Sequence, residues 1–493
     1  MQPISIGCMT WPLLATHWPC LTRELDSHAH LVKCRLCRPR FHGSGKLGST
    51  GINNAKPGVP RQTTNTRIAT WEPNNMSQTS ALPQKSTQQR IEVLPTGLSA
   101  FFDAPGPDMS IVERARGLQN LIRSKAKESE DQRRVCEEVV QAIHAQRLFH
   151  VSVPRRLGGL GGNFRTFIET VAEIGRADGG TGWATALLNV CTWFASLFGE
   201  QAQAEAFGPK GDTRICGIFT HPARNEKVAG GLRVSGEWGY GSGSAHAQWA
   251  TLGVKLGENP DGSPIPGLAL VPMSDLTIKD TWYVAGMSAS GSNTLVANDI
   301  FIPQHRIQSF IDMAAGDYAR TPSAEPNDYA SFIPVAEIIL VAVQLGLTRA
   351  AIDITLQKGA TKAVSYTIYN QMRTSPAHQI ELANAVSTAD QAHLLVARAC
   401  ADIDRAAAHK TKMDSLTRAR VRMDTGQAGK LCREAINRLM SINGAGSFAL
   451  ANPLQRIWRD SEIASRHAFV LPEMANLIYG RALFDIPELV QIF

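Results

Sequence analysis

Residues 235–249 read Ser235-Gly-Glu-Trp-Gly-Tyr-Gly-Ser-Gly-Ser-Ala-His-Ala-Gln-Trp249, a run rich in glycine and serine with aromatic residues among them. Because glycine has no Cβ, a backbone of this composition can approach a planar ligand closely. The run lies inside residues 213–309, where short β-type segments alternate with turns. We therefore expect a ligand-binding loop within a β-domain.

The segments around this loop carry the signals of strands and turns. Val228-Ala-Gly-Gly and Asn259-Pro-Asp-Gly are typical turn sequences, and they separate runs of apolar and β-branched residues. The predicted strands are Arg214–Phe219, Gly231–Gly236, Ala250–Val254, Gly267–Pro272, Thr277–Thr281 and Thr294–Ile302.

Helical periodicity dominates on either side of the β-domain, where apolar residues recur at helical spacing with charged residues between them. Val335–Leu356 is apolar on most faces, as expected of a helix buried in a bundle. The predicted helical segments are 111–148 and 164–206 upstream, and 335–356, 385–410, 415–442 and 454–480 downstream.

This order of helices, β-domain and helical bundle indicates an α+β fold. A chain of 493 residues is too long for one compact core, so two or three domains are expected. Residues 76–108 are polar and rich in proline, which is typical of a linker or arm. The predicted division is a disordered extension and linker at 1–108, an N-terminal helical domain at 109–210, a middle β-domain at 211–310 and a C-terminal helical bundle at 328–485.

The formal charge of +7 is concentrated near the N-terminus. Residues 1–75 hold nine Lys or Arg and three Asp or Glu, a balance of +6, so the rest of the chain is close to neutral. Nothing in this remainder indicates a nucleic-acid surface. No run of about 18 apolar residues is free of charges and helix breakers, so we expect no membrane span.

The nine cysteines are scattered singly, which suits a reducing compartment, and we expect a cytoplasmic protein. His30, Cys34, Cys37 and His42 have a spacing that could hold a metal. No pattern of a compact fold surrounds them, so we expect no metal site. We interpret residues 1–75 as an upstream extension without a role in the chemistry, with a transit peptide as the alternative.

A second informative stretch reads Arg456-Ile-Trp-Arg-Asp-Ser-Glu-Ile-Ala-Ser-Arg-His467. The sequence predicts that His467 lies late on the helix at 454–480. A histidine can exchange a proton near neutral pH. Together with the glycine- and serine-rich loop, far away in the sequence, it suggests a flavin pocket with an acid/base residue facing it.

Several further motifs occur in a fixed order with these two stretches: Val153-Pro-Arg-Arg-Leu-Gly-Gly-Leu-Gly-Gly, Gly180-Thr-Gly-Trp, Gly241-Ser-Gly, Gly286-Met-Ser-Ala-Ser-Gly-Ser-Asn and Asn452-Pro-Leu-Gln-Arg-Ile-Trp-Arg-Asp. Over about residues 110–485 the chain resembles the acyl-CoA dehydrogenase fold. Within it, the chain resembles the flavin-dependent aromatic monooxygenases of two-component systems. These include the oxygenase components of 4-hydroxyphenylacetate 3-hydroxylase and of the steroid-ring phenol hydroxylase.

The resemblance implies a monooxygenase that uses reduced FMN or FAD and O2 and hydroxylates a phenolic or heteroaromatic substrate, indole-like or polycyclic, through a C4a-hydroperoxyflavin. It also implies a homotetramer and a separate flavin reductase. No Rossmann fingerprint is present, since Gly158-Gly-Leu-Gly-Gly lies between helical segments. The alternative is an acyl-CoA dehydrogenase-like oxidoreductase. The Tyr-Glu-Gly type of motif for its carboxylate base is missing, because that region reads Ile442-Asn-Gly-Ala-Gly-Ser-Phe.

By resemblance, Ser242 lies near flavin N5, where a hydrogen bond would hinder the loss of peroxide. The alternative is that Ser242 and Ser244 only shape a turn. His467 occupies the place of the family's catalytic histidine and would share the phenolic proton as oxygen is transferred. The alternative is a helix histidine satisfied beside Arg466.

Other site residues follow from the same resemblance. Some relatives carry a second histidine at Cys191 and a tyrosine at Phe469, so both positions make the pocket less polar and favour an apolar substrate. Neutral drift with an unchanged substrate class is the alternative. Phe219 is expected to contact the substrate with them. The remaining expected flavin contacts are Trp183, Gly217, Gly241 and Ser292, while Arg456 and Arg459 could pair with flavin phosphate or with protein groups.

Overall fold

The computed structural model describes residues 104–321 and 323–486. The predictions for the extension and for His30, Cys34, Cys37 and His42 therefore lie outside the described residues. All the described residues belong to one compact unit, and the account below concerns that unit alone.

The described residues upstream of the strands form helices. Asp108, Asn163 and Asp178 each cap a helix by accepting a backbone N–H in its first turn. The helices are α2 (Met109–Gly117), α3 (Gln119–Gln132), α4 (Glu137–Ala145), α5 (Phe164–Gly175), α6 (Gly179–Ala195) and α7 (Glu200–Phe207). Nearly every residue of α6 is buried, because this helix packs against strand β1 on one side and helix α10 on the other.

The strands form two sheets, with the order β1-β4-β5-β8 in one and β2-β3-β7-β6 in the other. All neighbours are antiparallel except β1 and β4. The strands are β1 (Ile215–Ile218), β2 (Arg224–Val228), β3 (Gly231–Gly241), β4 (Trp249–Glu258), β5 (Pro264–Pro272), β6 (Thr277–Lys279), β7 (Asn293–Pro303) and β8 (Ile307–Ser309). Each predicted strand is present, whereas β2 and β8 were not predicted.

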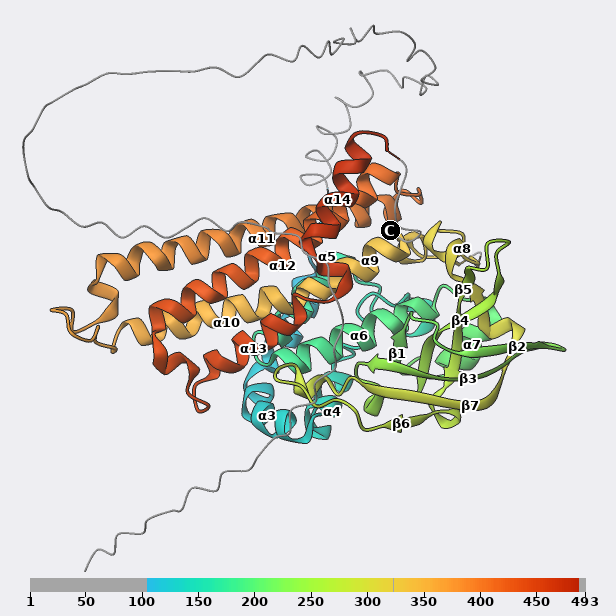
Figure 1. Cartoon of the computed structure of the whole chain (residues 1–493), viewed down its shortest axis with the longest axis horizontal. Coiled ribbons are helices and arrows are strands. Elements are labelled where there is room, and N and C mark those ends of the chain that lie inside the picture. Colours follow the sequence, from blue (N-terminus) through green and yellow to red (C-terminus); the bar gives the residue numbers. More distant parts are fainter. Residues whose placement is uncertain (1–103, 322, 487–493) are drawn as a thin grey trace, which may run out of the picture. The chain divides into compact units, whose positions relative to one another are not determined.

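The downstream part is helical, and α10, α11 and α12 run alongside one another (Figure 1). Its helices are α8 (Phe310–Ala314), α9 (Phe332–Ile338), α10 (Ala342–Gly359), α11 (Pro376–Ala408), α12 (Ser415–Asn443), α13 (Pro453–Ala464) and α14 (Pro472–Leu483). Phe332–Gly359 is long and apolar enough to cross a membrane, with a mean hydropathy of 1.8. However, 89% of its apolar window is buried within the structure, so its surroundings are those of a core helix.

Two local predictions are wrong. The single helix expected at 454–480 is two helices, α13 and α14, separated by a short 3-10 turn at Ala468–Val470 (η10). Pro472 starts α14, because proline is favoured at the first helical position and cannot continue a preceding helix. His467 is therefore the N-cap of the turn and does not lie on a helix. The glycine- and serine-rich stretch is also only partly a loop, since β3 continues to Gly241.

Candidate functional site

A cavity of about 640 Å³ lies where α6, the ends of β1 and β3, and the turn between α13 and α14 meet. Its walls are mainly apolar and aromatic. Of the predicted site residues, the cavity brings together Trp183, Cys191, Gly217, Phe219, Ser242, Ser292, His467 and Phe469. These residues come from five separate segments, so the fold assembles in space what the sequence spreads over nearly three hundred positions.

Helix α6 supplies one wall through a single face. Trp183, Leu187, Val190, Cys191 and Phe194 are spaced four, three, one and three positions apart, which is the spacing of one helical stripe. Trp183 is 8% exposed and Cys191 is 1% exposed. The structure thus explains why a tryptophan and a cysteine eight positions apart both reach the same cavity.

Three serine hydroxyls form a short hydrogen-bonded chain beside the cavity. The Ser242 and Ser292 hydroxyl oxygens are 2.8 Å apart, and the Ser292 and Ser290 hydroxyl oxygens are also 2.8 Å apart. The indole N–H of Trp183 donates to Ser242 Oγ at 3.2 Å. All three serines are buried, and Ser290 was not predicted. Ser290 belongs to the Gly286-Met-Ser-Ala-Ser-Gly-Ser-Asn motif, but the motif alone does not mark it as a site residue. Its hydrogen bond to Ser292 does.

The loop that carries Ser290 and Ser292 is held from α13. Asp460 Oδ1 accepts the backbone N–H of Met287 at 2.5 Å, and the Arg459 guanidinium donates to the Ala285 carbonyl. Burial, with a smaller contribution from the nearby Asp178, raises the pKa of Asp460 to about 7. Asp460 and Arg459 of the second sequence stretch therefore hold the loop beside the cavity through contacts with its backbone.

Neither Arg456 nor Arg459 is among the described residues that line the cavity. Arg456 lies 3.5 Å from Asp178 and 3.8 Å from Glu130, and Arg459 Nη2 lies 2.6 Å from Glu130 Oε1. Of the two alternatives left open by the sequence, the structure therefore provides protein carboxylates for both guanidinium groups.

His467 presents its ring to the cavity from the turn between α13 and α14. Phe469 N–H donates to His467 Nδ1 at 3.2 Å, so the lone pair of Nδ1 is used and Nε2 is the nitrogen left for a ligand. The ring centroid lies 6.1 Å from that of Trp183 and 5.7 Å from that of Phe469.

The surroundings of His467 favour its neutral form. Its side chain is exposed by surface area, but that surface faces the cavity, and protein atoms enclose the ring on its other sides. Desolvation by these atoms lowers the pKa of His467 to about 4, and the positive charge of Arg422 adds to the lowering. The imidazole is therefore uncharged at neutral pH.

Cys191 gives the cavity an uncharged thiol at the position where, by resemblance, some relatives carry a second histidine. Burial raises the pKa of this thiol well above its usual range, with a smaller contribution from Cys216. Phe219 continues the apolar wall into an aromatic cluster, because its ring lies 5.3 Å from Phe194 and 5.4 Å from Phe332. Among the described residues that line the cavity, none is Asp or Glu.

Three residues near Ser242 in the sequence do not line the cavity. Gly241 ends β3, and a Cβ there would lie 2.9 Å from the Asn293 carbonyl oxygen, so its place is explained by strand packing. Ser244 is 1% exposed. His246 is buried with Nδ1 3.6 Å from Glu137, and burial lowers its pKa to about 4.

The sequence did not predict two further aromatic residues of the cavity lining. Tyr240 and Trp282 line the cavity with ring centroids 5.8 Å apart. Tyr240 has a φ of 67°, a left-handed conformation that is unfavourable for a bulky side chain and recurs at functional sites. In the sequence, Trp282 ends Asp280-Thr-Trp and Tyr240 is the centre of Gly239-Tyr-Gly. Neither of these short sequences indicates that the two rings meet at a cavity.

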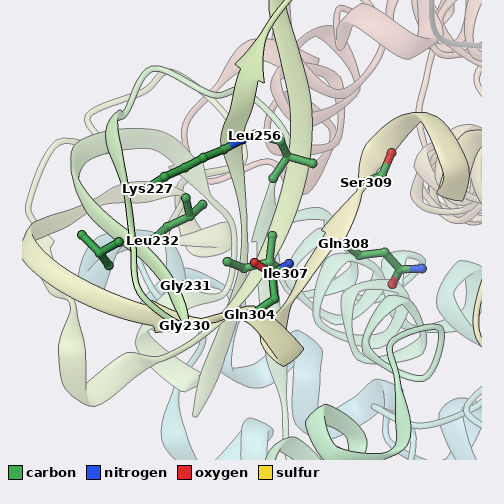
Figure 2. A pocket seen from close by; sticks show the side chains of 10 residues that line it. Lys227, Gly230, Gly231, Leu232, Leu256, Gln304, Ile307, Gln308 and Ser309 are labelled. Carbon is green, nitrogen blue, oxygen red and sulfur yellow. The ribbon is translucent and has the colours of Figure 1, made fainter.

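A second hollow, of about 560 Å³, lies at the end of the β-domain between the β2–β3 hairpin and β8 (Figure 2). Figure 2 shows Lys227, Leu232, Leu256 and Ile307 around it. It shares no lining residue with the first cavity, and Lys227 is the one charged residue in its lining. No predicted site residue reaches it, so the candidate site is the cavity beside His467.

The first cavity has the size and chemistry to hold the flavin ring. Its volume is within the range of about 300–1,000 Å³ that is usual for cofactor sites. Ser242 and Ser292 provide hydroxyl groups, whereas Trp183 and Trp282 provide flat aromatic surfaces. These four residues would hold the ring, and the apolar side next to Phe219 and Phe469 is left for a substrate.

Protein-family models match both helical parts of the chain. Residues 111–211 match the acyl-CoA dehydrogenase N-terminal domain, and residues 338–472 match the acyl-CoA dehydrogenase C-terminal domain. Together the two matches flank the β-domain and contain the α6 wall and the His467 turn.

Curated relatives and solved structures extend the match to the β-domain. The oxygenase subunit HsaA of a flavin-dependent monooxygenase from Rhodococcus jostii (strain RHA1) is 30% identical over 381 residues, covering 76% of this chain and 98% of its own. The oxygenase component of an FADH2-dependent resorcinol hydroxylase from Rhizobium sp. (strain MTP-10005) is 29% identical over 397 residues, covering 77% and 95%. The structure of XiaF from Streptomyces sp., in complex with FADH2 and glycerol, superposes with a TM-score of 0.74 at 29% identity, covering 83% of this chain and 100% of that chain.

Proposed function

This chain belongs to the flavin-dependent monooxygenases of the acyl-CoA dehydrogenase fold, as an oxygenase component, and we propose that it hydroxylates a neutral phenolic or heteroaromatic ring held beside His467. The observation that carries this proposal is the position of Trp183. Its indole N–H contacts Ser242, and its ring lies 6.1 Å from that of His467. One side chain thus connects the proposed flavin contact with the proposed substrate contact.

Reduced flavin, when bound, activates O2 for the transfer of one oxygen atom to the substrate. Ser242 is proposed to accept a hydrogen bond from flavin N5. Its oxygen accepts from Trp183, and its own hydrogen can go to Ser292, which leaves one lone pair for N5. Ser290 continues the chain and allows Ser292 to donate onward. In this arrangement Ser242 hinders the proton loss that would release H2O2.

His467 is proposed to hydrogen-bond the substrate oxygen at Nε2 while the phenolic proton leaves to solvent. With Nδ1 accepting the Phe469 N–H, the neutral ring carries its hydrogen on Nε2 and meets a substrate oxygen as a donor. Such a bond stabilises the phenolate, whose ring is more nucleophilic than that of the phenol. Uptake of the phenolic proton by Nε2 requires the other tautomer, which gives up the bond to Phe469.

The proposed substrate is an uncharged aromatic compound such as a polycyclic phenol or an indole. The thiol of Cys191 and the phenyl groups of Phe219 and Phe469 offer no strong hydrogen bond or charge to a carboxylated substrate. Arg466 is the one cation in the lining, but its guanidinium lies 2.5 Å from the Glu462 carboxylate. The named substrate of the Rhizobium relative, resorcinol, is likewise an uncharged phenol.

Desaturation of an acyl thioester is the competing function of this fold. It requires a carboxylate base against the substrate, and the described cavity lining contains none. A fold that has lost flavin binding altogether is the non-enzymatic alternative.

One experiment separates these functions. Photoreduced FMN or FAD is mixed anaerobically with the protein and a phenol or indole, O2 is added, and hydroxylated product and H2O2 are quantified. We expect product containing one oxygen atom from O2. In a parallel reaction with oxidised flavin and an acyl-CoA, a desaturated thioester together with reduced flavin would support the dehydrogenase, and failure to bind either reduced flavin would support the scaffold.

The remaining proposals concern partners and organisation. A separate reductase would supply the reduced flavin, and the protein would be cytoplasmic. Its domains would be an N-terminal helical domain at 109–210, a β-domain at 211–310 and a helical bundle at 328–485.

A homotetramer is supported by apolar side chains exposed on the bundle, namely Leu356 (55%), Ile380 (61%) and Leu394 (59%). Light scattering coupled to gel filtration would measure the oligomeric state, and a monomer would contradict the tetramer.

A further inference from the structure

A buried ion pair lies directly behind the turn that carries His467. Arg422 on α12 places Nη1 2.5 Å from Glu337 Oε1 on α9. Their side chains are 7% and 1% exposed, respectively, and neither residue is part of the described cavity lining. Both lie outside the motifs singled out in the sequence.

The same guanidinium makes two contacts with the turn. Its Nη2 donates to the Ala468 carbonyl at 3.1 Å, and its central carbon lies 4.8 Å from the centroid of the Phe469 ring. A planar fork can make such a bidentate and stacked set of contacts, whereas a lysine ammonium cannot. The two residues that follow His467 are therefore fixed by one side chain from another helix.

Two hydrogen bonds lie inside the turn itself. Within η10, Val470 N–H donates to the His467 carbonyl at 2.8 Å, and Phe469 N–H donates to His467 Nδ1. The second of these bonds sets the direction of the imidazole, and it depends on the position of the Phe469 backbone. A displacement of Ala468 or Phe469 would therefore rotate the His467 ring.

We propose that Arg422, oriented by Glu337, is a positioning residue for His467 that holds the His467–Phe469 turn against the cavity. The proposal rests on the proposed role of His467 in hydroxylation.

Charged groups face His467 from several elements. Arg422 approaches from α12, with Glu337 from α9 behind it, while Arg466 and Glu462 at the end of α13 pair with each other at the exposed mouth. After desolvation, the Arg422 charge is the electrostatic cause that lowers the pKa of His467. Removal of that charge should therefore raise the pKa of His467. Burial already raises the pKa of Glu337 to about 7 despite the Arg422 charge, so without Arg422 this carboxyl is protonated and adds no charge of its own.

Arg420 offers a matched control on the same helix. Its Nη2 lies 2.7 Å from Asp402 Oδ2 on α11, and the two side chains are 7% and 0% exposed. No described contact connects Arg420 with η10. Arg420→Met therefore removes an equally buried arginine and leaves a carboxylate, without a direct effect on His467.

The test measures His467 itself in the full-length protein without flavin. Diethyl pyrocarbonate labels neutral imidazoles, and peptide mass spectrometry reports the labelling rate of His467 from about pH 3 to pH 8, a range that includes the lowered pKa of about 4. We expect Arg422→Met to move the midpoint of labelling upward by about one pH unit relative to the wild-type protein. Arg420→Met should leave the midpoint unchanged although it lowers the melting temperature.

Two further variants separate charge from geometry. Arg422→Lys keeps the charge but not the fork, so the labelling midpoint should stay while kcat for product formation falls at least tenfold with KM nearly unchanged. Glu337→Gln keeps the shape of the pair but removes its negative charge, and it should lower kcat by a smaller factor than Arg422→Lys does. These variants also keep the proposal testable if Arg422→Met does not fold.

The proposal is overturned if Arg422→Met and Arg420→Met change the labelling of His467 equally, or if Arg422→Lys retains wild-type kcat. Because labelling reads His467 without substrate or flavin, its outcome is separate from that of the proposed function. If His467→Ala hydroxylates normally, His467 has no catalytic role, but the labelling midpoint of His467 would still differ between the wild-type protein and Arg422→Met.

Discussion

A methyl group placed on Gly217 would lie 2.7 Å from the sulfur of Cys191, closer than real Cβ contacts allow. Strand β1 therefore passes the α6 wall at a distance that only glycine permits. This close approach places the Gly217 backbone and the Cys191 thiol side by side in the lining of the cavity.

Gly217→Ala is expected to destabilise the protein by about 1–3 kcal/mol, the usual cost of overpacking a buried site. Cys191→Ala removes the sulfur and should recover much of that loss in the double variant. A double-mutant cycle on the free energy of unfolding measures the coupling. Additive effects of the two substitutions would show that Gly217 is constrained by something other than Cys191.

Ser242→Ala should shift the reaction from hydroxylation toward release of H2O2. The loss of one hydrogen bond is worth about 1 kcal/mol, so the ratio of product to H2O2 should fall roughly fivefold or more. Both products are quantified in single turnovers with reduced flavin. Ser244→Ala is the control, because Ser244 is equally buried but does not line the cavity. Equal ratios in the two variants would refute the N5 role of Ser242.

His467→Ala should slow hydroxylation by roughly 100-fold to 10,000-fold, the range for loss of a general acid or base. Binding of reduced flavin should change little, since the proposed flavin contacts are other residues. His246→Gln serves as the control, because His246 is buried against Glu137 away from the cavity. Unchanged hydroxylation in His467→Ala would make His467 a structural residue.

The dependence of hydroxylation on pH should lack the usual histidine transition. His467 acts in its neutral form, and its pKa is lowered to about 4, mainly by desolvation. The neutral form is therefore lost only as the pH falls through about 4, whereas an ordinary histidine would lose it below about 6.5. Product formed per reduced flavin should be flat between pH 5.5 and 8, and a midpoint near 6.5 would contradict the lowered pKa.

The order of helices and strands was predictable because it rests on local periodicity. Strand β2 was missed, since Arg224-Asn-Glu-Lys-Val lacks the apolar alternation of a half-buried strand and is held by its pairing with β3. The break between α13 and α14 was missed although Pro472 marks it. Helical spacing of apolar residues on both sides concealed the turn.

The site residues that belong to a sequence motif could be predicted, whereas those defined only by contacts between distant segments could not. Ser242 and His467 belong to recognisable stretches, and both reach the cavity. Arg422 and Glu337 are separated by 85 positions, and Arg422 contacts the turn from α12 while Glu337 on α9 pairs with Arg422. No local pattern encodes such a contact, because it depends on how α9, α12 and η10 pack.

The carbon-rich walls around Cys191, Phe219 and Phe469 have a consequence for how ligands compete. In the absence of strong polar contacts, neutral aromatics should rank by their partition coefficients between water and hydrocarbon. Each additional buried methylene would contribute about 0.8 kcal/mol, roughly a fourfold gain in affinity, until the ligand fills the space. Lipophilicity would then govern which ring enters, and the serine and histidine ends would govern which atom of it reacts.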